Sequence, residues 1–600
     1  MNRKSSTGAR YEGMSATCER KGLLQDTAGQ SRARRAGIVC RYTRFVVLTL
    51  ATVACVQSPV PPLGGTPAEQ LGRLESLYAD TRDLYFQIYV TDARGTERNA
   101  RGVALAEMRQ AHRALRERLT ESLHALDDER LGGDDREAVR VMLRQLAASA
   151  SIEAESAEAE SAGAVAPGTD RCAYMPSALA AGDSGFARLS ARIYECYGDA
   201  ARRVVTSTDT SDRLTVLGRL ATEPTREGRR ALFLSLQPIW RSVVGDGSAA
   251  SPYRTLLPLS AAQWRRDGSP IDAAARSLGM EPAGVESTLV RVLRAWRDHT
   301  PAQRVEPWDW YYDNGAASRT LSPGVTREGL REINDAFYRD QGADPTTLNI
   351  HYDLEPRDGK TPVAFTQFGK PARLRRGDYG ESEAWVFATY RTGGFDNLVE
   401  LLHETGHAIH VSGVATRPAF ADWPDSDPFT EALGDLLALE AYEPEWQKRY
   451  LRFAAPEAAS LRAKYSSIAL DVAWALLELR LHADPSRDPN AEWAAITSEY
   501  LHIIPHPEWG WWAMRGQLLE SPGYMMNYAL GAMIAAQLRD KVRAERGAFF
   551  DPDKKRYDWL SDHLYRFGLS RPTREVLRDV LGASLGADAL VGDMRRLLSR

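Results

Sequence analysis

The chain has 600 residues, of which 43% are hydrophobic and 26% are charged, and it contains 14 Trp and 23 Tyr. These values exclude a disordered chain and indicate a large buried core, too large for one small domain. The formal charge is −4, and the 76 Lys and Arg are scattered, which excludes an extended basic surface. We therefore expect no nucleic-acid partner.

Residues 1–55 are typical of an export leader. Arginines precede the apolar run Phe45–Ala54, which is too short to span a bilayer and has the length of the apolar part of a signal peptide. Cys55 resembles the lipid-acceptor cysteine of a bacterial lipoprotein, although Thr52 stands where leucine is usual. We predict an exported protein, either periplasmic, membrane-anchored through a lipid on Cys55, or secreted. A short buried helix is the alternative.

Two cysteines remain beyond this leader, Cys172 and Cys196. In an exported chain, such a pair predicts one disulfide bond. Two free buried thiols are the alternative, because the sequence carries no information on the distance between them.

Residues 56–300 are predicted to form the N-terminal helical part of a larger fold. The tetrapeptide 66–69 (TPAE) combines a helix N-cap, a proline at the first helical position and a capping-box glutamate, and apolar residues follow at helical spacing. Helical periodicity continues to about residue 297. It is interrupted at residues 151–170, a low-complexity segment without large apolar residues, where we expect a loop.

Residues 301–600 are predicted to form the catalytic part of the same fold. Three strand-like segments bounded by Gly and Pro lie between residues 348 and 391, and helical patterns then run from Asp396 to the C-terminus. The predicted fold class is therefore mainly α, with a small β-sheet just upstream of the helix that begins near Asp396.

The helix next to the predicted sheet contains the sequence LLHETGHAIH, residues 401–410. His403 and His407 are four residues apart, so both imidazoles project from one face and can reach one zinc ion at about 2.0–2.1 Å. Glu404 stands where a carboxylate can act as general base on the water at the metal without being a ligand. His410 is off this spacing, and we expect it to pack or to be solvated.

A catalytic zinc ion needs a third protein ligand and an open fourth position. Glu431 lies 24 residues after His407, within a second predicted helix, and can close the site as that ligand. Asp435, one turn further on, is placed to accept the free N–H of a liganding histidine, for which we expect His407. A solvated acidic helix face is the alternative for Glu431 and Asp435.

The segments HETGH (403–407) and EALGD (431–435), separated by 23 residues, resemble the zinc site of the angiotensin-converting enzyme family of peptidyl-dipeptidases. Residues 306–312 and 352–365 resemble the related thimet oligopeptidase and oligoendopeptidase family. Both families are gluzincin peptidases. The resemblance covers about residues 300–540. It implies a large helical ellipsoid divided by a deep substrate channel, with one Zn²⁺ per chain at its floor and short peptides as substrates.

The resemblance also implies that an edge strand just before the zinc helix pairs with the backbone of the substrate. The segment EAWVFATYR (383–391) fits this role by strand addition, with Val386, Phe387 and Ala388 at its centre. A purely structural sheet edge is the alternative.

A pair of tyrosines is expected near the scissile carbonyl in both families. Tyr524 and Tyr528 are four residues apart in a helical pattern preceded by Pro-Gly, where the resemblance places such a pair. We assign Tyr528 as the donor to the oxyanion and Tyr524 as a substrate contact. Packed core tyrosines are the alternative.

The chain departs from the angiotensin-converting enzyme pattern upstream of this pair. Gln517 stands where that family has a substrate-binding His, and Arg515 stands where it has a Lys that anchors the C-terminal carboxylate of the substrate. Gln can donate a hydrogen bond and Arg can bind a carboxylate bidentately, so both roles are open to them. His502 or His506 could instead supply the imidazole, and packing in a loop is the alternative for both.

The leading hypothesis is an exported zinc metallopeptidase of short peptides, either a peptidyl-dipeptidase or an oligoendopeptidase, and we expect a monomer. The alternative is a catalytically inactive zinc- or peptide-binding lipoprotein of the same fold. The intact Glu404 argues against it, because metal binding alone does not need that carboxylate. A purely structural helical protein would require Glu404, Glu431, Asp435 and the tyrosine pair all to be coincidental.

Overall fold

The structure, a computed structural model, describes residues 64–598 apart from residues 163–171, 173–175, 183–184, 358–359, 361–362, 372–373, 376–377, 380 and 552–554. The described residues belong to one compact unit, 62–600. The predicted export leader, with Cys55, lies outside them and stays a prediction.

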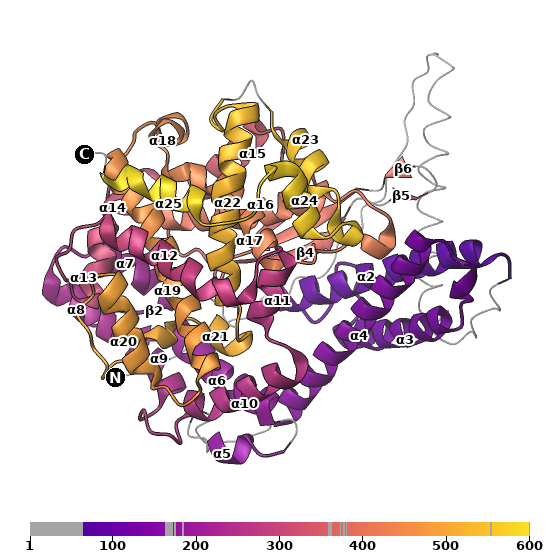
Figure 1. Cartoon of the computed structure of the whole chain (residues 1–600), viewed down its shortest axis with the longest axis horizontal. Helices are drawn as coiled ribbons and strands as arrows, with labels where there is room; N and C mark the ends of the chain where they lie inside the picture. The colour runs from indigo at the N-terminus through magenta and orange to yellow at the C-terminus, as the bar shows by residue number, and fades with distance from the viewer. Residues whose placement is uncertain are drawn as a thin grey trace, which may run out of the picture. The chain divides into compact units, whose positions relative to one another are not determined.

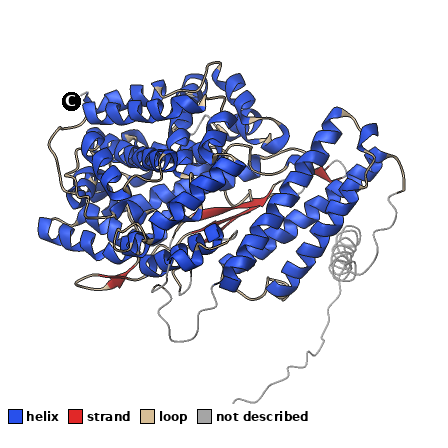
Figure 2. Cartoon of the chain, turned by 60° about the horizontal axis from the view of Figure 1, so that its bottom comes forward, coloured by secondary structure: helices blue, strands red, loops and turns tan. Residues whose placement is uncertain are grey.

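The described part of the chain is mainly helical, with short strands, which confirms the predicted fold class (Figure 2). The helices of the first half are α2 Pro67–Ala93, α3 Leu105–His124, α4 Gly133–Ala162, α5 Pro176–Leu179, α6 Gly185–Arg202, α7 Arg213–Thr222, α8 Arg226–Ser235, α9 Gln237–Val244, α10 Pro252–Asp267, α11 Pro270–Ser277 and α12 Val285–Asp298. The helices of the second half are α13 Pro307–Asn314, α14 Ala316–Leu321, α15 Arg327–Asp340, α16 Phe395–Gly413, α17 Asp427–Ala438, α18 Pro444–Leu451, α19 Glu457–Ala483, α20 Pro489–Tyr500, α21 Gln517–Glu520, α22 Met525–Arg546, α23 Tyr557–Leu560, α24 Thr573–Leu581 and α25 Asp588–Met594. Within the described ranges, none of these helices has both the length and the apolarity needed to cross a bilayer.

Helices α2, α3 and α4 pack against one another around a core of their own (Figure 1). Helix α2 begins with the predicted capping box, in which the N–H of Glu69 donates to the hydroxyl of Thr66 and the N–H of Thr66 donates to the carboxylate of Glu69. Apolar side chains at helical spacing fill the core between the three helices. They include Leu71, Leu74, Tyr78, Leu119, Leu123, Met142 and Leu146.

This three-helix group is joined to the segment that follows α16. Phe420, from the short 3₁₀ helix Pro418–Phe420, is part of its core. The guanidinium of Arg417 forms ion pairs with Glu75 of α2 at 2.8 Å and with Asp135 of α4 at 2.8 Å. The N-terminal helices therefore support the chain just beyond the C-terminal end of α16.

Helix α4 extends to Ala162, so the loop expected at residues 151–170 is wrong for residues 151–162. The alanines and glutamates that make this segment low in complexity are also strong helix formers, and they continue the helix without large apolar side chains. Residues 163–170 lie outside the described part.

Cys172 and Cys196 form a disulfide, with their Cα atoms 5.6 Å apart, which confirms the predicted pairing. Cys196 is buried within α6. The bond therefore ties the segment before α5 to the interior of the helical fold.

The main sheet lies against α16 and consists of β3 Ile350–Asp353, β7 Glu383–Phe387 and β4 Phe365–Lys370, in that spatial order. The central strand, β7, is parallel to β3 and antiparallel to β4. The expectation that this segment is a sheet edge is therefore wrong, because β7 is paired on both sides. Val386, Phe387 and Ala388 are fully buried and present no free backbone edge to a substrate.

The remaining strands form two small pairs. These are β1 Val204–Val205 with β2 Thr210–Ser211, and β5 Leu374–Arg375 with β6 Asp378–Tyr379. The larger hydrophobic core lies among the helices from α6 onward. Within it, α16 packs on α17, and α22 packs on both α17 and α19 (Figure 1).

Candidate metal centre

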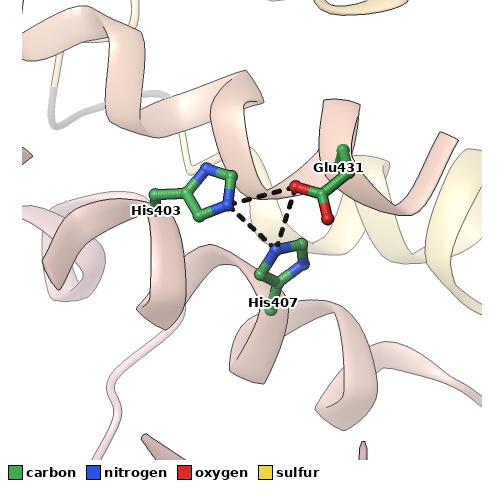
Figure 3. A group of neighbouring side chains, drawn as sticks. All are labelled: His403, His407 and Glu431. Atoms are coloured by element: carbon green, nitrogen blue, oxygen red, sulfur yellow. Dashed lines mark hydrogen bonds and ion pairs between the residues drawn. The ribbon is translucent and has the colours of Figure 1, made fainter. Parts of the chain in front are cut away.

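Three side chains from two helices converge where α16 packs on α17. His403 and His407 project from α16 and Glu431 projects from α17 (Figure 3). Nε2 of His403 lies 3.0 Å from Nε2 of His407 and 3.5 Å from Oε2 of Glu431, and Nε2 of His407 lies 3.9 Å from the same oxygen. Tetrahedral ligands at zinc distances are about 3.3 Å apart, so the three atoms are spaced for one ion.

Glycines allow α16 and α17 to approach each other this closely. A Cβ atom at Gly406 of α16 would lie 2.6 Å from the carbonyl oxygen of Gly434 in α17. A Cβ atom at Gly434 would lie 2.9 Å from ring atoms of both His403 and His407. Both distances are shorter than a normal carbon contact, so the metal-binding geometry depends on the absence of side chains at these two positions.

Asp435 contacts a different histidine from the one expected, so that expectation is wrong. Nδ1 of His403, not of His407, lies 2.7 Å from Oδ1 of Asp435. This contact orients the ring so that Nε2 faces the other two ligands. Burial lowers the pKa of His403, but Asp435 outweighs it and raises that pKa, so a metal ion must displace a proton from this ring.

The donor set fits a zinc ion. Oε2 of Glu431 is buried and has no hydrogen-bond donor among the described residues, although it faces both imidazoles. A buried carboxylate oxygen without a partner is costly, and a cation between it and the two rings would remove that cost. Burial lowers the pKa of His407 to about 3, so its ring is neutral and can bind a metal. Two nitrogens and one oxygen leave a fourth position open, as in catalytic zinc sites.

Glu404 lies beside these ligands and is 7% exposed. Its Oε2 accepts a hydrogen bond of 2.8 Å from the hydroxyl of Thr366, which comes from strand β4. Burial raises the pKa of Glu404 to about 7. A carboxylate with this pKa can both accept and return a proton near neutral pH, which is what a general base requires.

The tyrosine pair reaches the same site from the start of α22. Tyr524 is the residue that precedes the helix, and its hydroxyl donates a 2.6 Å hydrogen bond to Oε1 of Glu431. The ring of Tyr528 lies 5.5 Å from that of Tyr524, and its hydroxyl has no hydrogen-bond partner in the described part of the chain. Burial and the charge of Glu431 raise the pKa of Tyr528 well above its ordinary value, so it stays protonated and able to donate.

The guanidinium of Arg515 already has partners within the protein. It forms an ion pair with Asp471 of α19 and lies 4.7 Å from the centre of the Trp474 ring. The charge of Arg515 is therefore already balanced within the protein, and its role as a carboxylate anchor stays a prediction. Gln517 is half-buried at the first position of the short helix α21 and makes no side-chain hydrogen bond to a described residue.

The two upstream histidines, His502 and His506, form hydrogen bonds within the protein. Nε2 of His506 lies 2.7 Å from Oε2 of Glu306, and Nε2 of His502 lies 3.2 Å from the carbonyl oxygen of Arg297. Both imidazoles are therefore engaged in contacts within the protein. His410 is fully buried between two aromatic rings, which confirms that it packs.

A second arginine near the site was missed in the sequence. Arg213, the first residue of α7, is 9% exposed and has no hydrogen bond or ion pair to a described residue. Its charge lowers the pKa of Glu400, which lies one turn before His403 on α16, although burial raises that pKa overall. The side of α16 that carries Glu400 is therefore close to a guanidinium that forms no ion pair with a carboxylate in the described part.

Other missed residues differ in whether the sequence could have revealed them. Gly406 and Gly434 lie inside helical patterns, where glycine is unfavourable, and this is a usable signal of close helix packing. Thr366 is one of several polar residues in a strand, and Arg213 is one of many arginines. Nothing local distinguishes either of them.

Comparisons with known proteins bear on the fold and on the C-terminal part of this chain. Residues 510–598, which include the tyrosine pair but not the metal ligands, match the family model described as Carboxypeptidase Taq (M32) metallopeptidase. No curated protein matches the chain. The crystal structure of the M32 carboxypeptidase from Deinococcus radiodurans R1 has a TM-score of 0.51 and 15% identity over 88% of this chain and 100% of that chain. A carboxypeptidase from Pyrococcus furiosus has a TM-score of 0.49 and 16% identity over 89% of this chain and 99% of that chain. The Deinococcus radiodurans structure shows that this chain has the fold of an M32 carboxypeptidase. These findings do not bear specifically on the two families that the motifs resemble.

Proposed function

We propose that this chain is a zinc metallopeptidase that removes residues from the C-terminus of short peptides. The observation that carries the proposal is the convergence of His403, His407 and Glu431 beside the buried carboxylate of Glu404. The fold and the match of residues 510–598 support a carboxypeptidase over a peptidyl-dipeptidase or an oligoendopeptidase. A binding protein without activity would not need Glu404, which is not one of the three converging ligands.

A bound zinc ion would act as a Lewis acid on the scissile carbonyl and make a water molecule more acidic. Glu404 then accepts the proton of the attacking water and transfers it to the leaving amine, for which a pKa of about 7 is suitable. Thr366 holds the carboxylate of Glu404 in place through its hydroxyl.

The oxyanion that develops at the carbonyl needs a hydrogen-bond donor. Tyr528 remains our candidate, because its hydroxyl is protonated and uncommitted whereas that of Tyr524 is bound to Glu431. Removal of one such donor typically costs about 10²–10³ in kcat. We accordingly reassign Tyr524 from a substrate contact to a group that holds a metal ligand.

A carboxypeptidase must recognise the terminal carboxylate of its substrate. Arg213 is the stronger candidate for this role than Arg515, because Arg515 is paired with Asp471 whereas Arg213 forms no ion pair with a carboxylate among the described residues. A guanidinium binds a carboxylate through two parallel hydrogen bonds, which favours a free C-terminus over an amide.

Export through the predicted leader and lipidation of Cys55 remain part of the proposal. The disulfide between Cys172 and Cys196 supports export, because such bonds persist mainly in oxidising compartments. We propose a monomer that is periplasmic, membrane-anchored or secreted.

The products formed from defined peptides test this function. Blocked and free-ended peptides of four to ten residues would be incubated with the zinc-loaded protein, and the products identified by mass spectrometry. We expect successive loss of single C-terminal residues and no cleavage of C-terminally amidated peptides. Release of dipeptides would favour a peptidyl-dipeptidase, and internal cleavage of amidated peptides would favour an oligoendopeptidase.

A further inference from the structure

A buried glutamate that takes no part in the proposed chemistry accepts hydrogen bonds from the backbone on either side of Tyr524. Glu478 lies near the C-terminal end of α19 and is fully buried. Its Oε1 accepts a 2.7 Å hydrogen bond from the N–H of Gly523, and its Oε2 accepts a 3.1 Å hydrogen bond from the N–H of Met525. The carboxylate therefore holds the two peptide groups that flank Tyr524.

Stability alone does not explain a carboxylate at this position. Glu478 has no ion pair with any described residue and is fully buried, and burial raises its pKa to about 8 although the two N–H donors lower it. Burying a charge without a counter-ion is unfavourable, so a well-packed apolar side chain would suit the interior better. The two N–H donors at the start of the 22-residue helix α22 offset part of this cost, because a helix N-terminus favours negative charge.

The contact made by Tyr524 shows what the carboxylate positions. The hydroxyl of Tyr524 lies 2.6 Å from Oε1 of Glu431, whose other oxygen faces the two histidines. Gly523 in the same turn has a φ of +96°, and a Cβ atom there would lie 2.7 Å from Pro270 and 3.2 Å from Trp264. The turn before α22 is therefore bound by Glu478 and lies close to helices α10 and α11.

We propose that Glu478 is a positioning residue of the metal centre, which holds Tyr524 so that its hydroxyl orients the ligand Glu431. This inference rests on the proposed function, because it assumes that Glu431 binds zinc. Glu478 touches neither the metal ligands nor a reacting atom, and it acts through the backbone on both sides of Tyr524.

Zinc affinity, measured by competition with a chelator on the full chain, tests this role without reference to turnover. In Glu478→Gln the side-chain amide can accept from only one of the two N–H groups, because its nitrogen is a donor. We expect zinc to bind about tenfold more weakly, which is at the lower end of the effect of losing an outer contact to a metal ligand. We also expect the visible spectrum of the cobalt-substituted protein to change.

A double-mutant cycle separates positioning from general destabilisation. Tyr524→Phe should weaken zinc binding to a similar extent, and Glu478→Gln should add less than about twofold in the Tyr524→Phe background, because both act on one contact. Asp488→Asn is the control. Oδ1 of Asp488 accepts from two backbone N–H groups at the start of α20, its Oδ2 lies 2.9 Å from the guanidinium of Arg254, and its replacement should leave zinc affinity unchanged.

The outcomes distinguish this inference from the proposed function. Unchanged zinc affinity in a folded Glu478→Gln protein, or fully additive effects in the cycle, would overturn the role of Glu478 and leave the peptidase proposal intact. If Glu478→Gln does not fold, Glu478→Asp supplies the test, because it keeps the carboxyl group but shortens the reach, and we expect the same weakening. A wild-type protein that binds no zinc would instead overturn the proposed function itself.

Discussion

Nδ1 of His403 lies 2.7 Å from Oδ1 of Asp435, one turn beyond Glu431 on α17. Helix α17 thus supplies both a predicted metal ligand and the group that orients another ligand. The positions of the predicted ligands therefore depend on one another across the packed pair of helices α16 and α17.

Asp435→Asn should weaken zinc binding. The amide can still accept from Nδ1–H of His403, but it lacks the charge that makes the ring more basic. We expect zinc affinity to fall by about 10–100-fold, the usual effect of losing an outer carboxylate partner of a ligating histidine. Chelator competition measures this change. Asp588→Asn, at an exposed ion pair on α25, is the control and should bind zinc as the wild type does.

Gly434→Ala should disrupt the site by steric overlap alone. The added methyl group would lie 2.9 Å from both predicted histidine ligands, and helix α17 would have to move away from α16. Overpacking of this kind typically costs about 1–3 kcal/mol in the free energy of unfolding. Bound zinc and thermal unfolding check both consequences.

Gly72→Ala is the matched control for this substitution. Gly72 lies within helix α2, and a Cβ atom there would meet no atom within 4 Å. The thermal midpoint should stay the same or rise, because alanine favours the helix by up to about 1 kcal/mol. Equal behaviour of the two variants would contradict the steric account of the α16–α17 contact.

Thr366→Val should shift the acidic limb of the pH profile of kcat/KM. Burial raises the pKa of Glu404, and the hydrogen bond from Thr366 lowers it. Without the hydroxyl the pKa rises, so the active, deprotonated form is populated only at higher pH and the limb moves upward. We expect a loss of about 10–100-fold at neutral pH, the worth of one hydrogen bond to a charged group. Thr366→Ser keeps the hydroxyl and should retain the wild-type profile.

Glu443, in a charge network far along the chain from the zinc motif, should stabilise the fold above acidic pH. Burial raises its pKa, but Arg596, Lys464 and Arg539 outweigh burial and lower it to about 2. A lowered carboxylate pKa stabilises the folded state above the unfolded pKa of about 4.3, and this stabilisation is lost as the pH falls toward 2.

Glu443→Gln should therefore lower the free energy of unfolding by about 3 kcal/mol at pH 7, and the difference should shrink between pH 4.5 and pH 2. Denaturant unfolding at several pH values measures this. Glu445→Gln, two residues away at an exposed ion pair with Lys448, is the control and should change stability by no more than about 1 kcal/mol.

The parts of the site that follow from local spacing could be predicted from the sequence. His403 and His407 share a helix face because they are four residues apart, and a catalytic zinc ion then requires a further ligand such as Glu431. The composition of residues 151–162, which lacks large apolar side chains, predicts a loop, although its alanines and glutamates also favour the helix that the structure shows.

Features that depend on how distant elements meet could not be predicted. Which histidine Asp435 contacts depends on how α16 crosses α17, which no local pattern encodes. Strand β7 is central because β4 pairs on its other side, and strand order is not visible in the alternation of a single strand. Arg515 is paired with Asp471, which lies 44 residues earlier in the chain, and no local pattern encodes this contact.

Zinc content and turnover of Glu404→Gln and Glu431→Ala test the central claim most directly, because they separate metal binding from chemistry. Both variants and the wild type would be purified, loaded with zinc, and assayed for metal by atomic absorption and for release of C-terminal residues. We predict one zinc ion per chain and no measurable turnover for Glu404→Gln, and loss of both zinc and turnover for Glu431→Ala. Full zinc occupancy in Glu431→Ala, or wild-type turnover in Glu404→Gln, would contradict the assignment of this site as a peptidase centre.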